Sequence, residues 1–210
     1  MLFPDLKEIE RKPQQYWNVD GLPDLITGVL WIVWGVAFLL PELLPPGGWL
    51  NYYWLAVMLV LIVGGVASNW AIKKLKQRLT FPRTGYVEWP EPAPASKVIS
   101  SLLAAAVAAG GVALAIRGNA QPMKDLVAPG LALLMALAFL IAALRLRLPH
   151  YFWMVAASLL LALIVARAPL GLGMGIICLF LCLGALSLLI GIVRLWSYRR
   201  NNPPPQEGEA

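Results

Sequence analysis

The chain has 210 residues, of which 60% are hydrophobic and only 13% are charged. Because an ordinary soluble domain carries about 25% charged residues, a soluble globular protein is excluded and a multi-pass membrane protein is indicated. The formal net charge of +6 is typical of basic cytoplasmic loops that face anionic lipid headgroups, so we expect no nucleic-acid partner. One histidine and two cysteines are too few for a usual zinc centre or a disulfide framework, and neither a metal nor a cofactor is expected.

Apolar blocks of about the length needed to cross a bilayer recur along the chain, bounded by charged residues, proline or glycine. They cover residues 22–44, 52–72, 98–116, 126–144, 151–166 and 170–193. This pattern predicts an all-α membrane protein with six transmembrane helices. The block 151–166 is the shortest of them, and a re-entrant segment is the alternative interpretation there.

Lysine and arginine are unequally distributed between the two sides of this predicted topology. With the N-terminus inside, 14 of the 17 fall on the inner side, and only Arg117, Lys124 and Arg167 fall outside. Short loops rich in lysine and arginine stay in the cytoplasm. We therefore predict that both termini are cytoplasmic.

The segments between and beside the spans divide the chain further. Residues 1–21 combine charges with apolar residues at helical spacing, which predicts a segment lying along the membrane interface. Helices 1 and 2 occupy 22–72, and helices 3 to 6 occupy 98–196. Residues 73–97 form the predicted cytoplasmic loop. The proline-rich composition near the C-terminus predicts a disordered tail over 197–210.

The loop 73–97 is basic at its start and aromatic afterwards. Its first cations follow the second span directly, and we expect them to contact anionic lipid headgroups; they are Lys73, Lys74, Lys76 and Arg78. Further along, four residues favour docking of a protein partner, with packing against the protein's own helix ends as the alternative; they are Phe81, Arg83, Tyr86 and Trp89.

A stretch of this loop, Leu79-Thr80-Phe81-Pro82-Arg83-Thr84-Gly85-Tyr86-Val87, resembles a loop motif of uncharacterised multi-pass bacterial membrane proteins. The resemblance covers nine residues. It implies a bacterial inner-membrane setting, and it implies no activity.

The two halves of the chain share an internal similarity. Asp24-Leu25-Ile26 aligns with Asp125-Leu126-Val127 at an offset of 101, and Tyr52-Tyr53-Trp54 aligns with Tyr151-Phe152-Trp153 at an offset of 99. Chance similarity between apolar segments is the alternative. If the similarity is a duplication, each unit contains three spans, so the second unit enters from the opposite side. Such inverted repeats build many transporters, with a substrate site between the halves.

The corresponding first helices of the two units each carry a one-sided stripe that begins with an aspartate and includes small residues. The stripes are Asp24, Gly28, Trp31 and Gly35 in one unit, and Asp125, Pro129, Ala132 and Ala136 in the other. Small residues let helices approach closely, and these positions are candidates for a helix interface or a pathway. For both aspartates, helix capping is favoured over a gate or an ion-binding role.

Charged residues are placed only at span ends, which disfavours a proton-coupled transporter. His150 is interpreted as a loop residue with no orienting partner, and no catalytic constellation is recognised, so we do not expect an enzyme. The leading hypothesis is a small inverted-repeat transporter or channel for a neutral, apolar or lipidic solute. The alternative is a membrane-embedded scaffold, sensor or accessory subunit that binds a partner through 73–97. A homodimer is compatible with the small surface that six short helices bury.

Overall fold

The computed structural model describes residues 17–45, 47–81, 126–168 and 170–203, and these residues are helical with no strand among them. Five of the helices are long and apolar enough to cross a membrane, which indicates an integral membrane protein. They are α2 (Leu22–Leu43), α3 (Trp49–Leu79), α7 (Val127–Leu146), α8 (His150–Arg167) and α9 (Gly171–Asn201).

These helices coincide with five of the six predicted spans. The shortest predicted span is α8, a continuous helix of 18 residues. The predicted span 98–116 and the N-terminal segment 1–16 lie outside the described residues, so the count of six spans stays a prediction. The predicted disordered tail begins too early, because α9 runs through Asn201 and keeps Tyr198 buried.

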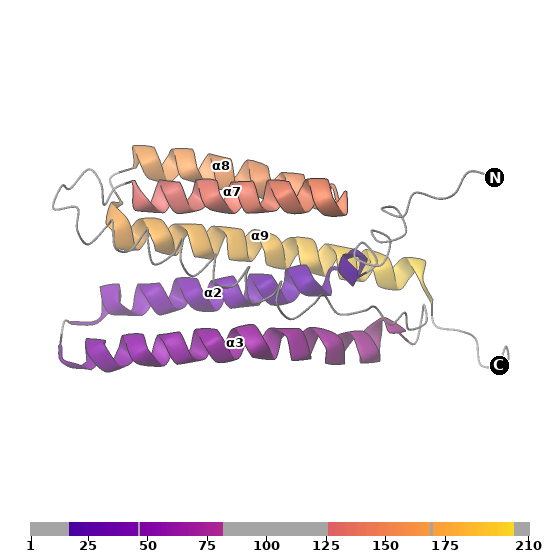
Figure 1. The fold of residues 1–210 in the computed structure, drawn as a ribbon, viewed down its shortest axis with the longest axis horizontal. Coiled ribbons are helices and arrows are strands. Elements are labelled where there is room, and N and C mark those ends of the chain that lie inside the picture. The colour runs from indigo at the N-terminus through magenta and orange to yellow at the C-terminus, as the bar shows by residue number, and fades with distance from the viewer. Residues whose placement is uncertain (1–16, 46, 82–125, 169, 204–210) are drawn as a thin grey trace.

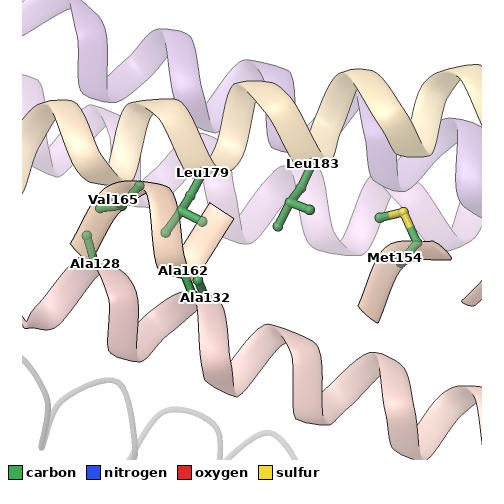
Figure 2. Close-up of a cluster of buried hydrophobic side chains, with 7 residues drawn as sticks. All are labelled: Ala128, Ala132, Met154, Ala162, Val165, Leu179 and Leu183. Carbon is green, nitrogen blue, oxygen red and sulfur yellow. The ribbon is translucent and has the colours of Figure 1, made fainter. Parts of the chain in front are cut away.

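The helices form an antiparallel bundle with α9 near its centre (Figure 1). The α7–α8 hairpin packs on one side of α9, and α2 packs on the other side, with α3 beyond α2. Figure 2 shows the apolar core where α7, α8 and α9 meet. Small side chains of the α7–α8 hairpin interlock there with two leucines of α9; the cluster contains Ala128, Ala132, Met154, Ala162, Val165, Leu179 and Leu183.

Glycines allow the backbones of α2 and α9 to touch along their length. A Cβ atom added to Gly28 would lie 2.6 Å from the backbone nitrogen of Leu188. On the facing helix, a Cβ atom on Gly191 would lie 2.5 Å from the nitrogen of Leu25. Since real Cβ atoms do not approach so closely, the seam formed by Gly28, Gly184 and Gly191 admits only glycine at Gly28 and Gly191, while a Cβ atom on Gly184 would lie 3.0 Å from Ile32.

One end of the bundle is strongly basic. The start of α2 meets the end of α3 there through Asp20 and Lys76, and it meets the start of α8 and the end of α9 through the contacts of Asp24 with His150 and Arg194. The end of α7 lies at the same end, because only three residues separate it from α8. Among the described residues, every lysine and arginine except Arg167 belongs to this end. We call it the basic end.

Candidate functional site

The first turn of α2 begins with a constrained backbone. Gly21 has φ of 75°, and a Cβ atom at this position would lie 2.7 Å from the carbonyl oxygen of Gly191. The carboxylate of Asp20 accepts a hydrogen bond of 3.2 Å from the backbone N–H of Leu22. Thus Asp20, and not the predicted Asp24, satisfies a free N–H group at the start of this helix.

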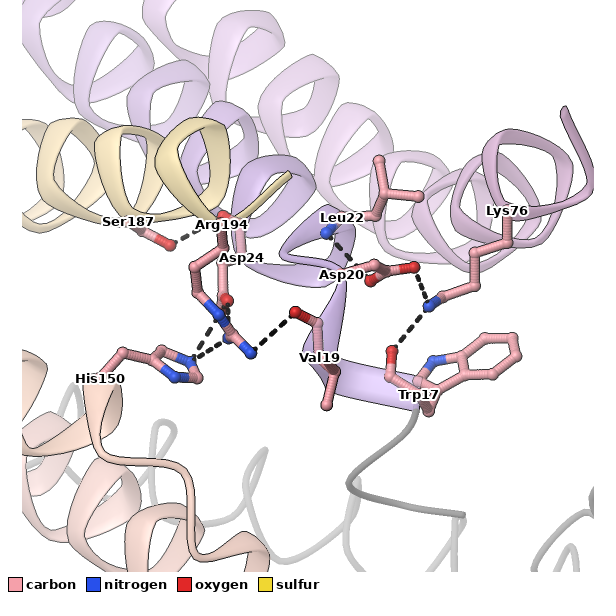
Figure 3. Close-up of polar contacts among 9 residues, drawn as sticks. All are labelled: Trp17, Val19, Asp20, Leu22, Asp24, Lys76, His150, Ser187 and Arg194. Carbon is pink, nitrogen blue, oxygen red and sulfur yellow. Dashed lines mark hydrogen bonds and ion pairs between the residues drawn. The ribbon is translucent and has the colours of Figure 1, made fainter. Parts of the chain in front are cut away.

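Asp24 instead takes part in a cluster that joins three helices (Figure 3). Its Oδ2 atom accepts a hydrogen bond of 2.9 Å from Nη1 of Arg194 on α9, and it lies 3.2 Å from Nε2 of His150 on α8. Nη1 of Arg194 also lies 2.8 Å from Nε2 of His150. The three side chains are at most 18% exposed, so a triad of ionisable side chains closes this end of the bundle interior.

Backbone contacts hold the triad in position. Nη2 of Arg194 donates a hydrogen bond of 3.0 Å to the carbonyl oxygen of Val19. The hydroxyl of Ser187 donates a hydrogen bond of 2.8 Å to the carbonyl oxygen of Asp24. Arg194 and Ser187 lie seven residues apart on one face of α9. This face therefore binds Asp24 twice, at its carboxylate through Arg194 and at its backbone carbonyl through Ser187.

A second buried ion pair joins α3 to the start of α2. The ammonium group of Lys76, whose residue is 1% exposed, contacts the carboxylate of Asp20 and donates a hydrogen bond of 2.7 Å to the carbonyl oxygen of Trp17. The hydroxyl of Thr80 donates a hydrogen bond of 3.1 Å to the same carboxylate. The prediction that Lys76 contacts lipid headgroups is therefore wrong: the burial of Asp20 requires a cation, and Lys76 supplies it.

A cavity of about 260 Å³ lies beside the triad, between α2, α7, α8 and α9. Asp24 and His150 line one part of it, and the rest of the lining is mainly apolar and aromatic. The lining residues are Pro23, Asp24, Thr27, Ala138, Phe139, Ala142, His150, Tyr151, Met154, Ser187 and Ile190. The rings of Phe139 and Tyr151, 6.3 Å apart, form the aromatic part of the lining, and Trp31 lies behind Phe139 with its ring 5.6 Å away.

One further polar group lies deeper in the bundle. Ser158 is fully buried on α8, one helical turn from the cavity residue Met154 on the same face. Its hydroxyl has no hydrogen-bond partner among the described residues. Since a buried hydroxyl without a partner costs about 1–3 kcal/mol, this position is suited to a polar guest such as water or a solute.

The predicted stripe on α2 is divided between two neighbours. Gly28 and Gly35 face α9, Trp31 contacts Phe139 of α7, and only Asp24 lines the cavity.

The stripe on α7 is buried at Pro129, Ala132 and Ala136, while Asp125 lies outside the described residues. The two stripes therefore lie in different interfaces.

Two glycines, Gly171 and Gly175, lie in the first turns of α9. Gly175 packs against Ala128 of α7 and Val165 of α8.

The residues predicted for the cytoplasmic loop are only partly described. Lys73, Lys74 and Arg78 are exposed near the end of α3, and the ammonium of Lys74 lies 4.4 Å from the ring centre of Trp70. Phe81 is partly buried. The remaining residues of the loop prediction, Arg83, Tyr86 and Trp89, lie outside the described residues.

Sequence reasoning missed Arg194 and misplaced His150. His150 is the first residue of α8 and has two charged neighbours, so the interpretation as a loop residue without an orienting partner is wrong. The sequence does contain a signal for Arg194. This arginine shares one helical face with three residues that are buried on α9, namely Ser187, Gly191 and Tyr198.

No protein-family model, curated protein or solved structure matches the chain. Within the described residues, no group of three or more histidine, cysteine, aspartate or glutamate side chains is arranged to hold a metal ion.

Proposed function

We propose that the protein is a small transporter of the bacterial inner membrane that carries a small, mostly apolar solute through the cavity between α2, α7, α8 and α9. The observation that carries the proposal is the cavity itself, which has a mainly apolar wall and the ionisable triad at one side, with the buried hydroxyl of Ser158 one helical turn beyond the lining residue Met154. Ligand pockets for drug-sized molecules span about 300–1,000 Å³. A volume of about 260 Å³ suits a smaller solute.

A six-span, inverted-repeat architecture is part of this proposal. α3 ends at the basic end, whereas α7 begins at the opposite end, where Ala128 lies near Gly175 at the start of α9. The chain between α3 and α7 must therefore connect opposite ends of the bundle, which supports a further span at 98–116.

The direction of the helices also agrees with inverted repeats. α2 runs opposite to α7, and α3 runs opposite to α8, as two units of inverted topology require. The two hairpins are packed differently, however: 6% of the most apolar stretch of α3 is buried, against 28% for α8. In the proposed repeat, the two units share the order and direction of their helices, but they differ in how those helices pack.

The distribution of charge supports an orientation with the basic end in the cytoplasm. Positively charged segments next to spans stay on the cytoplasmic side. The exposed pairs Lys74–Trp70 and Arg200–Trp196 combine a cation with an indole, as residues at a membrane border commonly do.

A cysteine at Ser158 tests the transporter proposal, because alternating access must expose a deep pathway position to water from each side in turn. In a background with Cys178 and Cys182 replaced by alanine, we expect Ser158→Cys to react with a membrane-impermeant, sulfonate-bearing methanethiosulfonate added to either right-side-out or inside-out vesicles. Mass spectrometry of the intact protein measures the modified fraction.

The matched control is Ala132→Cys, which is equally buried but lies in the apolar core of α7. It should remain unmodified from both sides. If Ser158→Cys is modified from one side only or from neither, the transporter proposal is wrong.

The exposure of Lys74 and Arg78 at the end of α3 favours a second candidate, an accessory subunit that binds a partner through loop 73–97. The test compares proteins that co-purify from native membranes with the intact chain and with a variant in which Phe81, Arg83, Tyr86 and Trp89 are alanine. Identical sets of partners would argue against this candidate.

A further inference from the structure

Nε2 of His150 faces both a donor and an acceptor: Nη1 of Arg194 lies 2.8 Å away and Oδ2 of Asp24 lies 3.2 Å away. A guanidinium group carries only donors, so the shorter of these contacts, with Nη1 of Arg194, favours Nε2 as an acceptor. The imidazole is then neutral, with its proton on Nδ1. The ion pair between Asp24 and Arg194 is complete without a charge on His150.

A proton added to Nε2 would reverse these contacts. The new N–H group would point at a cation, and two positive charges would lie about 2.8 Å apart. The nearest acceptor is Oδ2 of Asp24, at 3.2 Å. Protonation therefore moves His150 from Arg194 to Asp24, and the contact between Arg194 and His150 breaks.

Among the residues that line the cavity, the ionisable side chains are Asp24, His150 and Tyr151. Tyr151, which follows His150 in the chain, has its ring 4.2 Å from the imidazole. The α7 residues that line the cavity are Ala138, Phe139 and Ala142, and all are uncharged. Asp24 and Arg194 are thus the charged groups that face His150 from α2 and α9.

We propose that the His150–Asp24 pair is the binding site of a coupling proton, and that proton binding at Nε2 opens the cavity by breaking the Arg194–His150 contact between α8 and α9. This inference rests on the proposed transport function and names the proton as the ion that drives it. The position of ionisable residues at span ends disfavours proton coupling in the sequence analysis; Asp24 and His150 do lie at helix starts, but the triad that they form with Arg194 is buried there. Buried ionisable groups beside a cavity are the usual carriers of protons in membrane transporters.

His150 is the single histidine of the chain, so selective ¹⁵N-histidine labelling reports on this site alone. The protein is purified through an affinity tag that contains no histidine and is placed in lipid nanodiscs. At about pH 8 we expect the tautomer with a bare Nε2 and a protonated Nδ1, and at about pH 5.5 we expect both nitrogens to be protonated. An Nε2–H tautomer at the higher pH, or a spectrum that does not change with pH, would overturn the proposal.

Opening of the cavity is measured separately through Ala142→Cys, a cavity position, in the background without native cysteines. Its rate of modification by the impermeant reagent is divided by that of Gln77→Cys, an exposed residue of α3, because thiol reactivity itself depends on pH. We expect this normalised rate to rise about tenfold between about pH 8 and about pH 5.5.

Two substitutions of His150 fix its charge. His150→Gln retains an acceptor for Arg194 but cannot bind a proton, so the normalised rate should stay low at both pH values. His150→Lys places a permanent cation beside Arg194, so the rate should stay high at both. A tenfold rise that persists in His150→Gln would assign proton sensing to another group and refute the proposal.

The outcomes separate this inference from the transport proposal. If Ser158→Cys is modified from both sides while His150 does not titrate, transport stands and the coupling proton is refuted. If His150 titrates and opens the cavity while Ser158→Cys stays unreactive, the transport function is refuted instead. The labelling of unmodified protein with ¹⁵N-histidine requires no variant, so the proton site stays testable even if a substitution prevents folding.

Discussion

Lys76→Met should lower the free energy of unfolding by about 3–5 kcal/mol, since it leaves a buried carboxylate without its counter-ion. Asp20 is fully buried, and its partners are Lys76, Thr80 and the backbone N–H of Leu22. Methionine fills a similar volume, so the loss reflects charge rather than a cavity. Reversible unfolding in mixed dodecyl maltoside and SDS micelles, followed by circular dichroism, measures the change.

The chain offers a matched control two residues away. Lys74 is exposed and lies over the ring of Trp70, so Lys74→Met should change stability by less than about 0.5 kcal/mol.

The double variant Lys76→Met with Asp20→Asn should be more stable than Lys76→Met alone, because asparagine keeps an acceptor for Leu22 without a buried charge. Equal losses for Lys76→Met and Lys74→Met would show that the ion pair does not stabilise the fold.

The membrane spans could be predicted from the sequence because length and hydropathy determine them locally. The ends of α2, α7 and α8 fall within a few residues of the predicted blocks. The ends of α3 and α9 were placed too early, because both helices continue past the apolar block into basic residues. That extension carries Lys76 and Arg194 inside the bundle, where hydropathy alone predicts neither.

The triad could not be predicted, because its members are far apart in the chain. The hydrogen bond between Asp24 and Arg194 joins residues separated by 170 positions, and His150 joins them from a third helix. Periodicity within one helix identifies a buried face but not the residue that meets it. The spacing of small residues on α2 predicts a close helix contact, but it does not identify α9 as the partner; the structure shows this partner through Gly28, which lies against Leu188.

Gly28→Ala should destabilise the protein by about 1–3 kcal/mol or prevent its folding, because overpacking at a backbone contact forces the two helices apart. The new methyl group would lie 2.6 Å from the nitrogen of Leu188 and 2.9 Å from the carbonyl oxygen of Gly184. Neither is the end of a flexible side chain, so α2 and α9 must separate. Unfolding in the same mixed micelles, together with elution volume on size exclusion, measures the effect.

Gly65→Ala on α3 and Gly130→Ala on α7 are matched controls, since a Cβ atom at either position meets nothing within 4 Å. Both glycines lie within helices, where alanine is favoured by about 1 kcal/mol, so these variants should be as stable as the parent or slightly more stable. A Gly28→Ala variant that behaves like these controls would contradict the close approach of α2 and α9. Because the seam presents Asp24 and Arg194 to one another, a true separation of the helices should also abolish the bare-Nε2 tautomer of His150, which links the packing of the bundle to the chemistry of its site.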